Sequence, residues 1–348
     1  MKRIIETGGT YFAAANSFNG FKSNFKSVFD PENYERIFIL KGGPGTGKST
    51  LMKRVAKHFS ESECVITRFL CSSDPSSLDG VTIGLENKKI AIIDGTSPHM
   101  TDPEIPGACE HIINLTEALN FKELRKRKAE LSALNTKKRA YYKAAYEYLR
   151  TAGEIHNLIC EKIRKSKVYK EAEEICDMIL GYEIFSKTDE AARDDLHLGA
   201  FGKDGYVRAD IPCIEKEYLS VVGDGFTDRV VMDILRSKLI REDIMRILAY
   251  SPLTHKDIDA IITTSLIIST DNVGSVIFDT SPLALSQDKE YTELIAVYRN
   301  LLSISQSHFA LASREHSELE KIYVSNIDFS YNEKCVFEIN KEIGEILY

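Results

Sequence analysis

Residues 37–50 read Ile-Phe-Ile-Leu-Lys-Gly-Gly-Pro-Gly-Thr-Gly-Lys-Ser-Thr. The first four residues are apolar and predict a short buried strand. The stretch from Gly42 to Ser49 has the spacing G-x-x-x-x-G-K-[ST], which is the pattern of a phosphate-binding loop. Residues 51–59 then carry apolar side chains at a 3.6-residue period, which predicts a helix. The pattern therefore lies between a strand and a helix, the context in which such loops bind phosphate.

The residue types of this loop suit a phosphate group. Glycines let backbone N–H groups converge on phosphate oxygens without a Cβ clash, and the start of the following helix adds partial positive charge. We expect Lys48 to neutralise the β- and γ-phosphates and the Ser49 hydroxyl to bind Mg²⁺. The expected nucleotide contacts are Gly42, Gly43, Pro44, Gly45, Thr46, Gly47, Lys48, Ser49 and Thr50.

A second strand, which ends in an acid, follows the loop. Residues 90–93 are apolar and Asp94 comes directly after them, where a carboxylate can bind Mg²⁺ or accept a hydrogen bond from its water. Residues 64–70 predict a further strand in between. This alternation of strand, helix and strand predicts an α/β fold with a parallel, doubly wound sheet.

On these motifs the chain resembles the P-loop NTPase superfamily. The resemblance implies binding of a nucleoside triphosphate with Mg²⁺ in the first half of the chain. The sequence has no N/T-K-x-D guanine-recognition motif, because its nearest string, residues 186–189, differs at the first position. ATP is therefore favoured over GTP. The absence of an L-S-G-G-Q signature disfavours an ABC-type ATPase.

The motif leaves open which residue activates water. Gly95 follows Asp94, at the position where many fast ATPases have a glutamate, so we expect slow hydrolysis or another residue in that role. His99 is the candidate beside Lys48 and Asp94, either as a γ-phosphate sensor or as a water-positioning group. The alternative for His99 is an ordinary surface-loop histidine. Asp74 is open to two interpretations, a base for a substrate hydroxyl or a solvated turn residue.

The second half of the chain repeats the first. The matched pairs are residues 38–48 with 219–229, residues 77–80 with 257–260, and residues 92–98 with 277–282. Matches in one order at a nearly constant offset predict two tandem copies of one domain, at residues 1–190 and 191–348. The chain resembles a bacterial family of ATP-binding proteins with duplicated P-loop domains, which implies nucleotide binding and little further chemistry.

The second loop departs from the phosphate-binding pattern. Asp224 and Asp228 replace Gly43 and Gly47, and Val230 replaces the serine that binds Mg²⁺, Ser49. Two carboxylates repel a polyphosphate, by about 4 kcal/mol for unit charges 4 Å apart at an effective dielectric of 20. We therefore expect the second copy to bind no nucleoside triphosphate. Asp79 has a counterpart, Asp259, in this degenerate half, which favours a turn role for both.

Helical segments are predicted to close each half as a hairpin or arm. In the first copy the arm spans about 118–185, with Gly153 separating two partner helices. The second copy ends with helical stretches at 289–323 and 332–347. Residues 122–143 hold nine Lys and Arg but two Glu, which fits a nucleic-acid or partner surface or a solvated arm. Because the charges surround the helix, we favour the solvated arm.

Composition limits the class of protein. Of the 348 residues, 43% are hydrophobic and 28% charged, which excludes a disordered or collagen-like chain, and the net charge of -7 does not suit a nucleic-acid coat. The seven cysteines are widely spaced, as expected for reduced thiols in a cytoplasmic protein. The first residues lack the apolar stretch of a signal peptide, and no long apolar run predicts a membrane helix.

These observations predict a cytoplasmic protein that binds Mg²⁺ and ATP at one competent site. Slow ATP hydrolysis is the expected reaction. The alternatives are a small-molecule or nucleotide kinase, and a switch in which bound ATP signals to a partner without turnover. The partner is open between a protein and a small molecule, and nucleic acid is not favoured.

Overall fold

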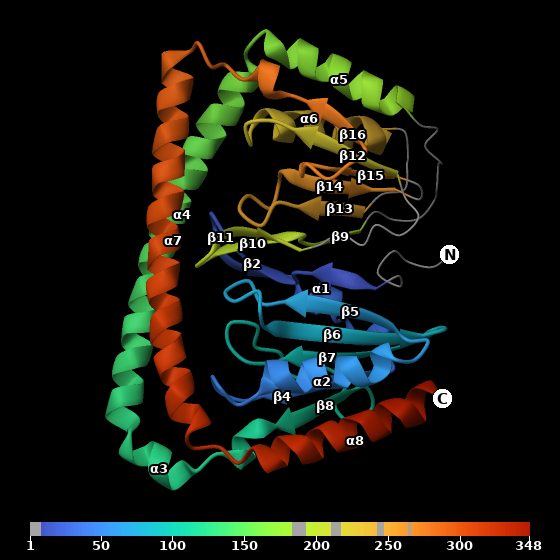
Figure 1. Ribbon diagram of the computed structural model, residues 1–348, viewed down its shortest axis with the longest axis vertical. Coiled ribbons are helices and arrows are strands. Elements are labelled where there is room, and N and C mark those ends of the chain that lie inside the picture. Colours follow the sequence, from blue (N-terminus) through green and yellow to red (C-terminus); the bar gives the residue numbers. More distant parts are fainter. Residues whose placement is uncertain (1–7, 183–192, 210–216, 242–246, 264–265) are drawn as a thin grey trace.

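The computed structural model describes residues 8–182, 193–209, 217–241, 247–263 and 266–348. The chain has a mixed α/β fold in which two sheets follow one another along the long axis of the molecule (Figure 1). Two long helices, α4 (Lys128–Arg164) and α7 (Lys289–Val324), run side by side along one flank of both sheets.

The first sheet surrounds the strand that leads into the glycine-rich loop. Its central strand is flanked by parallel neighbours, whereas β6 runs antiparallel to both of its neighbours. In spatial order the strands are β1 (Gly9–Tyr11), β5 (Val65–Leu70), β6 (Leu78–Leu85), β7 (Lys88–Asp94), β4 (Arg36–Lys41) and β8 (Glu110–Asn114).

The second sheet has the same strand order and the same strand directions as the first. Its central strand is parallel to both of its neighbours, and the third strand of the order below is antiparallel to both of its own. In matching order the strands are β9 (Arg193–Leu196), β13 (Ile247–Tyr250), β14 (Ile258–Ile262), β15 (Leu266–Ser269), β12 (Glu217–Val222) and β16 (Val276–Asp279). The two sheets therefore repeat one topology.

Two sequence expectations are corrected by this topology. The sheets are mixed rather than parallel, because residues 78–85 form a strand that a tight turn at Glu86, with φ 52°, returns into β7. The alignment of residues 92–98 with 277–282 is also wrong. Strand β15 occupies the place of β7, whereas β16 occupies the place of β8.

Two hairpins join the halves. They are β2 (Ala14–Ser17) with β3 (Gly20–Ser23), and β10 (Gly199–Gly202) with β11 (Gly205–Arg208). Between them Phe12 and His197 exchange backbone hydrogen bonds of 2.9 and 3.1 Å, so the two copies meet at equivalent positions. The amide of Asn16 donates to the Phe201 carbonyl at 2.8 Å across the same boundary.

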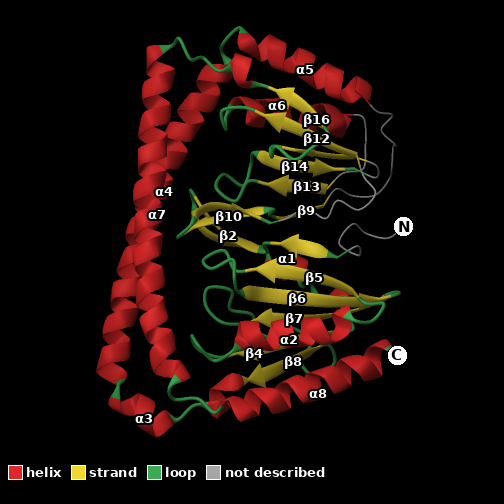
Figure 2. Cartoon of the chain, in the orientation of Figure 1, coloured by secondary structure: helices red, strands yellow, loops and turns green. Residues whose placement is uncertain are grey.

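Shorter helices cover the sheets and link the strands (Figure 2). Helix α2 buries its apolar stripe, which includes Leu51, Val55 and Phe59, against β-strand residues of the first sheet, as its 3.6-residue period predicts. The remaining α-helices are α1 (Phe25–Val28), α2 (Lys48–Ser60), α3 (Phe121–Lys126), α5 (Val168–Tyr182), α6 (Thr227–Arg241) and α8 (Phe329–Leu347). Short 3₁₀ turns are η2 (Pro31–Asn33), η3 (Leu115–Ala118) and η4 (Ser281–Leu283).

The expected helical hairpin within the first arm does not form. Helix α4 continues through Gly153, and its main antiparallel partner is α7 from the other copy. A Cβ at Gly153 would lie 2.7 Å from Phe18, so this glycine permits close approach of the β2–β3 hairpin instead of ending the helix.

The long helices carry the terminal helices to the opposite sheet. Ile179 of α5 packs with Leu219 and Leu235 in the core of the second half. Ile339 of α8 packs with Phe38 in the core of the first half. Each sheet is therefore covered by a helix that follows the other copy in sequence (Figure 1).

Two further features are the hydropathy of the helices and the state of the cysteines. Within the described ranges, no helix is long and apolar enough to cross a bilayer. The described cysteines, Cys64, Cys71, Cys109, Cys160, Cys176 and Cys335, carry free thiols. The seventh, Cys213, lies outside the described residues.

We predict that Gly153→Ala lowers the free energy of unfolding by about 1–3 kcal/mol, because the new methyl group overpacks against Phe18. Gly344→Ala on α8 is the matched control, since a Cβ there meets nothing within 4 Å and alanine favours a helix by up to about 1 kcal/mol. Denaturant titration of both variants measures the difference. Equal stability of the two variants would refute the close contact.

Candidate nucleotide site

The glycine-rich loop connects β4 to α2 in a conformation that depends on its glycines. Gly45 and Gly47 have φ of 69° and 85°, in the left-handed region that L side chains rarely adopt. The Thr46 hydroxyl donates to the Gly43 carbonyl at 2.9 Å and closes the loop on itself. The loop thus ends directly at the first turn of α2, which begins at Lys48, in the strand–loop–helix order that the sequence pattern predicts.

Lys48 and Asp94 are brought together at the carboxyl edge of the first sheet. The register of β4 and β7 pairs Leu40 with Asp94, so the acid lies beside the start of the loop. The Lys48 ammonium lies 3.6 Å from the Asp94 carboxylate and donates to the Gly42 and Gly43 carbonyls at 2.9 and 3.0 Å. Both side chains are only 12–15% exposed.

The oxygen atoms near Lys48 suit Mg²⁺. Ser49 Oγ accepts a 2.9 Å hydrogen bond from the Leu78 N–H, and Asp94 Oδ1 accepts from the backbone N–H and the hydroxyl of Thr96 at 2.9 and 2.6 Å. Mg²⁺ is commonly held by one or two protein oxygens together with substrate phosphates and water. In the described part of the chain, no cluster of three His, Cys, Asp or Glu offers a metal site of its own. The donor set therefore fits Mg²⁺ that arrives with a polyphosphate.

The C-terminal helices pack directly on the loop, which no sequence pattern indicated. The amide of Asn332 on α8 donates to the Thr46 carbonyl at 2.8 Å. A Cβ at Gly45 would lie 2.9 Å from the Glu320 carbonyl on α7, and the Tyr323 ring faces Gly43. The loop glycines thus serve helix packing as well as backbone conformation.

A group of charged side chains from both long helices faces this end of the sheet. Lys138 Nζ on α4 lies 3.5 Å from His316 Nδ1 on α7. Burial, followed by the positive charges of Lys138 and Lys48, lowers the pKa of His316 to about 4. Burial and the charge of Asp74 raise the pKa of Glu320, which Lys48 partly opposes. The electrostatics of the loop therefore depend on residues almost 300 positions apart in sequence.

His99 is not a surface-loop histidine. It is 6% exposed, its ring stacks on Phe25 with centroids 4.4 Å apart, and its Nε2 lies 3.0 Å from Asp79 Oδ2. Asp79 sits at a β-bulge in β6 where Phe69 pairs with Gly80 but Leu70 pairs with Leu78. The sequence reasoning placed Asp79 in a turn. The repeated aspartate at Asp259 was the available signal that the position matters.

Asp74 belongs to the contact between the halves. Lys203 of the β10–β11 turn donates to its carboxylate at 3.0 Å, and Ser76 donates at 3.0 Å. Burial alone would raise the pKa of Asp74, but hydrogen bonds from Lys203 and Ser76 bring it below the ordinary value. A carboxylate held in this way is a weak candidate for a base.

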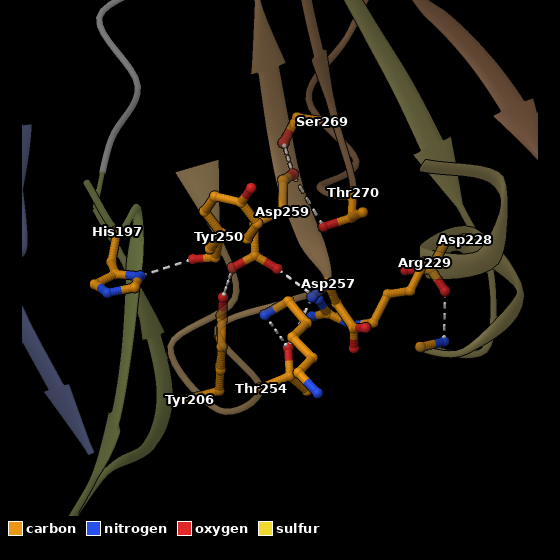
Figure 3. A network of polar contacts seen from close by, with 12 residues as sticks. His197, Tyr206, Asp228, Arg229, Tyr250, Thr254, Asp257, Asp259, Ser269 and Thr270 are labelled. Atoms are coloured by element: carbon orange, nitrogen blue, oxygen red, sulfur yellow. Dashed lines mark hydrogen bonds and ion pairs between the residues drawn. The ribbon is translucent and has the colours of Figure 1, made fainter. Parts of the chain in front are cut away.

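The second loop is filled by its own carboxylates. Asp224 Oδ1 accepts the N–H groups of Phe226 and Thr227, each at 3.0 Å. Asp228 Oδ1 accepts the Gly225 N–H at 2.9 Å (Figure 3). The donors that would face a phosphate in the first loop are therefore occupied in the second.

The cation of the second loop is also occupied. Arg229, which aligns with Lys48, turns toward Asp259 at 2.6 Å, and the Tyr206 hydroxyl donates to the same carboxylate (Figure 3). Val230, at the position of Ser49, is buried. Arg229, Asp224 and Asp228 are thus each paired within the chain.

The basic segment 122–143 is partly paired on its own helices. Lys126 lies 2.7 Å from Glu123, and Arg127 lies 2.8 Å from Glu130. These pairs link exposed neighbours one turn apart, as in a solvated helix.

Comparison with known proteins yields one partial match. Residues 21–83 match the family model described as Nephrocystin 3, N-terminal. The matched segment contains β4, the glycine-rich loop, α2 and β5, with most of β3 and β6. Neither the curated proteins nor the solved structures gave a match to the chain.

We predict that Asp228→Asn stabilises the protein at neutral pH. Burial raises the pKa of Asp228 from 3.8 to about 6 in the folded state, although Arg229 opposes the shift. The folded state therefore holds this proton more tightly, so the stability contributed at this site falls as pH rises from about 4 through 6. The variant should gain up to about 3 kcal/mol at pH 7 and nothing at pH 3.

Urea titrations at the two pH values measure this difference. Asp204→Asn, at an exposed turn, is the control and should change stability by less than about 0.5 kcal/mol. A destabilised Asp228→Asn variant at pH 7 would contradict the prediction.

Proposed function

We propose that the chain consists of two tandem P-loop NTPase-like domains and binds Mg²⁺-ATP at a single site, the loop of residues 42–50. The observation that carries this proposal is the convergence of Lys48, Ser49 and Asp94 at one end of a strand–loop–helix unit. The self-filled second loop supports a stoichiometry of one nucleotide per chain.

Each residue of the first loop has a role in this proposal. The backbone N–H groups of residues 42–50 bind phosphate oxygens, and the Lys48 ammonium exchanges its carbonyl partners for the β- and γ-phosphates. Ser49 and Asp94 hold Mg²⁺, which supplies positive charge to the phosphate oxygens. The free thiols of the described cysteines support a cytoplasmic location.

Slow ATP hydrolysis is the proposed reaction. A side chain at position 95 would collide with Ile39 and lie 3.5 Å from the Leu40 carbonyl. The fold therefore has no room for the glutamate that fast ATPases use at this position. A kinase is less well supported, because Asp74, its proposed base, is held by Lys203.

A nucleotide-dependent switch is the second candidate function. The contacts of Glu320, Tyr323 and Asn332 with the loop favour it, because α7 extends from this loop to the second sheet. Phosphate binding that moves the loop would move α7 against α4. ATP hydrolysis would then reset the helix pair instead of driving a reaction on another substrate.

We predict that Lys48→Ala weakens Mg²⁺-ATP binding by about 100-fold or more, because two charge-assisted phosphate contacts of about 1.5–3 kcal/mol each are lost. Lys57→Ala is the matched control, since Lys57 is an exposed lysine further along the same helix. Isothermal titration calorimetry measures both variants. Equal binding by Lys48→Ala and the unaltered protein would refute the site.

The same titration tests the single site. We expect one Mg²⁺-ATP per chain, because the donors of the second loop are occupied by Asp224 and Asp228. Two equivalents of bound ATP would contradict this assignment. Omission of Mg²⁺ should weaken binding in the unaltered protein.

ADP release distinguishes the candidate functions. Release in ATP alone that does not respond to metabolites supports a hydrolase, and release coupled to a phosphorylated metabolite supports a kinase. Tight ATP binding without ADP release supports the switch. A panel of metabolites, RNA, DNA and candidate proteins provides the comparison.

A further inference from the structure

Asp79 and His99 form a buried pair beside the proposed ATP site. We infer that His99 accepts the proton of the attacking water and that Asp79 positions its imidazole. This inference rests on the proposed ATP site and names the base that the Asp94-Gly95 sequence lacks. Asp79 acts through His99 and is a positioning residue.

The pair is placed at the site by two backbone relationships. Leu78, which directly precedes Asp79, donates its N–H to Ser49 Oγ at 2.9 Å. The antiparallel register of β6 and β7 pairs Gly80 with Ile93, and Asp79 and Asp94 are the next residues of these two strands at that end of the ladder. The bulge at Asp79 lies at the same sheet edge as the phosphate loop.

The polar atoms of the pair are buried and incompletely bonded. Asp79 and His99 are each 6% exposed. Among the described residues, neither His99 Nδ1 nor Asp79 Oδ2 has a partner in hydrogen-bond geometry, although Nε2 and Oδ2 lie 3.0 Å apart. Buried polar atoms are rarely left unpaired, because each costs about 1–3 kcal/mol. Since Oδ2 faces Nε2 within the pair, the unpaired Nδ1 is the atom that indicates a place for a water or a ligand.

The position of the carboxylate selects the tautomer of His99. Since Nε2 faces Asp79, the proton is best placed on Nε2, and the lone pair lies on Nδ1. This is the arrangement by which a carboxylate orients a histidine base and stabilises its imidazolium form. Phe25, stacked on the ring, and Phe21, with centroids 5.2 Å from it, restrict rotation of the imidazole.

The second half contains an aspartate at the position equivalent to Asp79, beside a loop that we propose binds no nucleotide. Asp259 occupies the equivalent bulge and is bound by Arg229, the counterpart of Lys48, and by Tyr206, from the equivalent hairpin (Figure 3). The bulge aspartate is therefore within reach of the loop cation. In the first half Lys48 turns to the loop carbonyls instead, and the carboxylate remains with His99.

Other titratable groups near the pair are unsuited to the role. Burial raises the pKa of the Cys71 thiol well above its ordinary value, and the Asp79 charge adds to the shift. Burial also raises the pKa of Tyr142, which faces the pair from α4. Asp94 is committed to Thr96 and Lys48. Among these groups His99 is the one with an unused nitrogen lone pair.

The proposed step is balanced. The oxygen of water forms a bond to the γ-phosphorus while the bond from that phosphorus to the β,γ-bridging oxygen breaks, and ADP leaves with the electron pair. The water proton passes to His99 Nδ1, and Asp79 stabilises the resulting imidazolium. Transfer of the proton to phosphate or solvent restores the neutral ring.

The test compares His99→Gln and Asp79→Asn in the full chain. We expect both to keep the Kd and KM for Mg²⁺-ATP within about twofold and to lower kcat, by about 10²-fold or more for His99→Gln. Imidazole added to His99→Ala should restore part of the rate. His156→Gln is the matched control, because His156 makes the same 3.0 Å contact with Asp257 in the degenerate half.

The outcomes separate this inference from the proposed function. If the unaltered protein binds no Mg²⁺-ATP, both the proposed function and the inferred role of the His99–Asp79 pair are overturned. If ATP binds without ADP release, or if kcat is unchanged in His99→Gln, only the inferred role of the His99–Asp79 pair is overturned. An equal fall of kcat in His156→Gln also overturns it, since the effect would then follow from loss of any buried His–Asp contact.

Discussion

The antiparallel contact between α4 and α7 determines how the rest of the molecule is assembled. The two helices run along both sheets and carry α5 and α8 to opposite ends. Each core is completed by a helix from the other copy, so neither core is complete without the helices that the long pair carries. The glycine-rich loop is consequently covered by the C-terminal quarter of the chain, which contacts it through Tyr323 and Asn332.

Local features of this fold could be predicted from the sequence, and distant ones could not. The strand, loop and helix over residues 36–60 follow from an apolar run, glycines and a 3.6-residue period, all within one short window. The partner of α4 is not encoded in this way, because an apolar stripe specifies a buried face and not the helix that covers it. Gly153 was misread as a break for the same reason, since its contact, Phe18, is far away in sequence.

In the candidate site, too, the residues set by local motifs could be predicted and those set by distant contacts could not. Lys48, Ser49 and Asp94 were identified from motifs, and the structure brings them to one edge. The repetition of Asp79 as Asp259 predicts a turn role, because a residue kept in the degenerate half is expected to be structural. The bulge that places it beside His99 depends on the register of three strands, which residue spacing alone does not reveal.

The carboxylates of the second loop have a consequence for the behaviour of the whole chain. Asp224 is an anion that is covalently part of the chain. Its effective concentration at the N–H donors of the loop is therefore fixed by the fold, whereas that of a free nucleotide varies with conditions. If ATP binds the first loop as proposed, the second half would therefore keep one state at every nucleotide level. Any motion that ATP then induced in the first half would occur relative to a second half that does not respond, whose core α4 and α7 both contact.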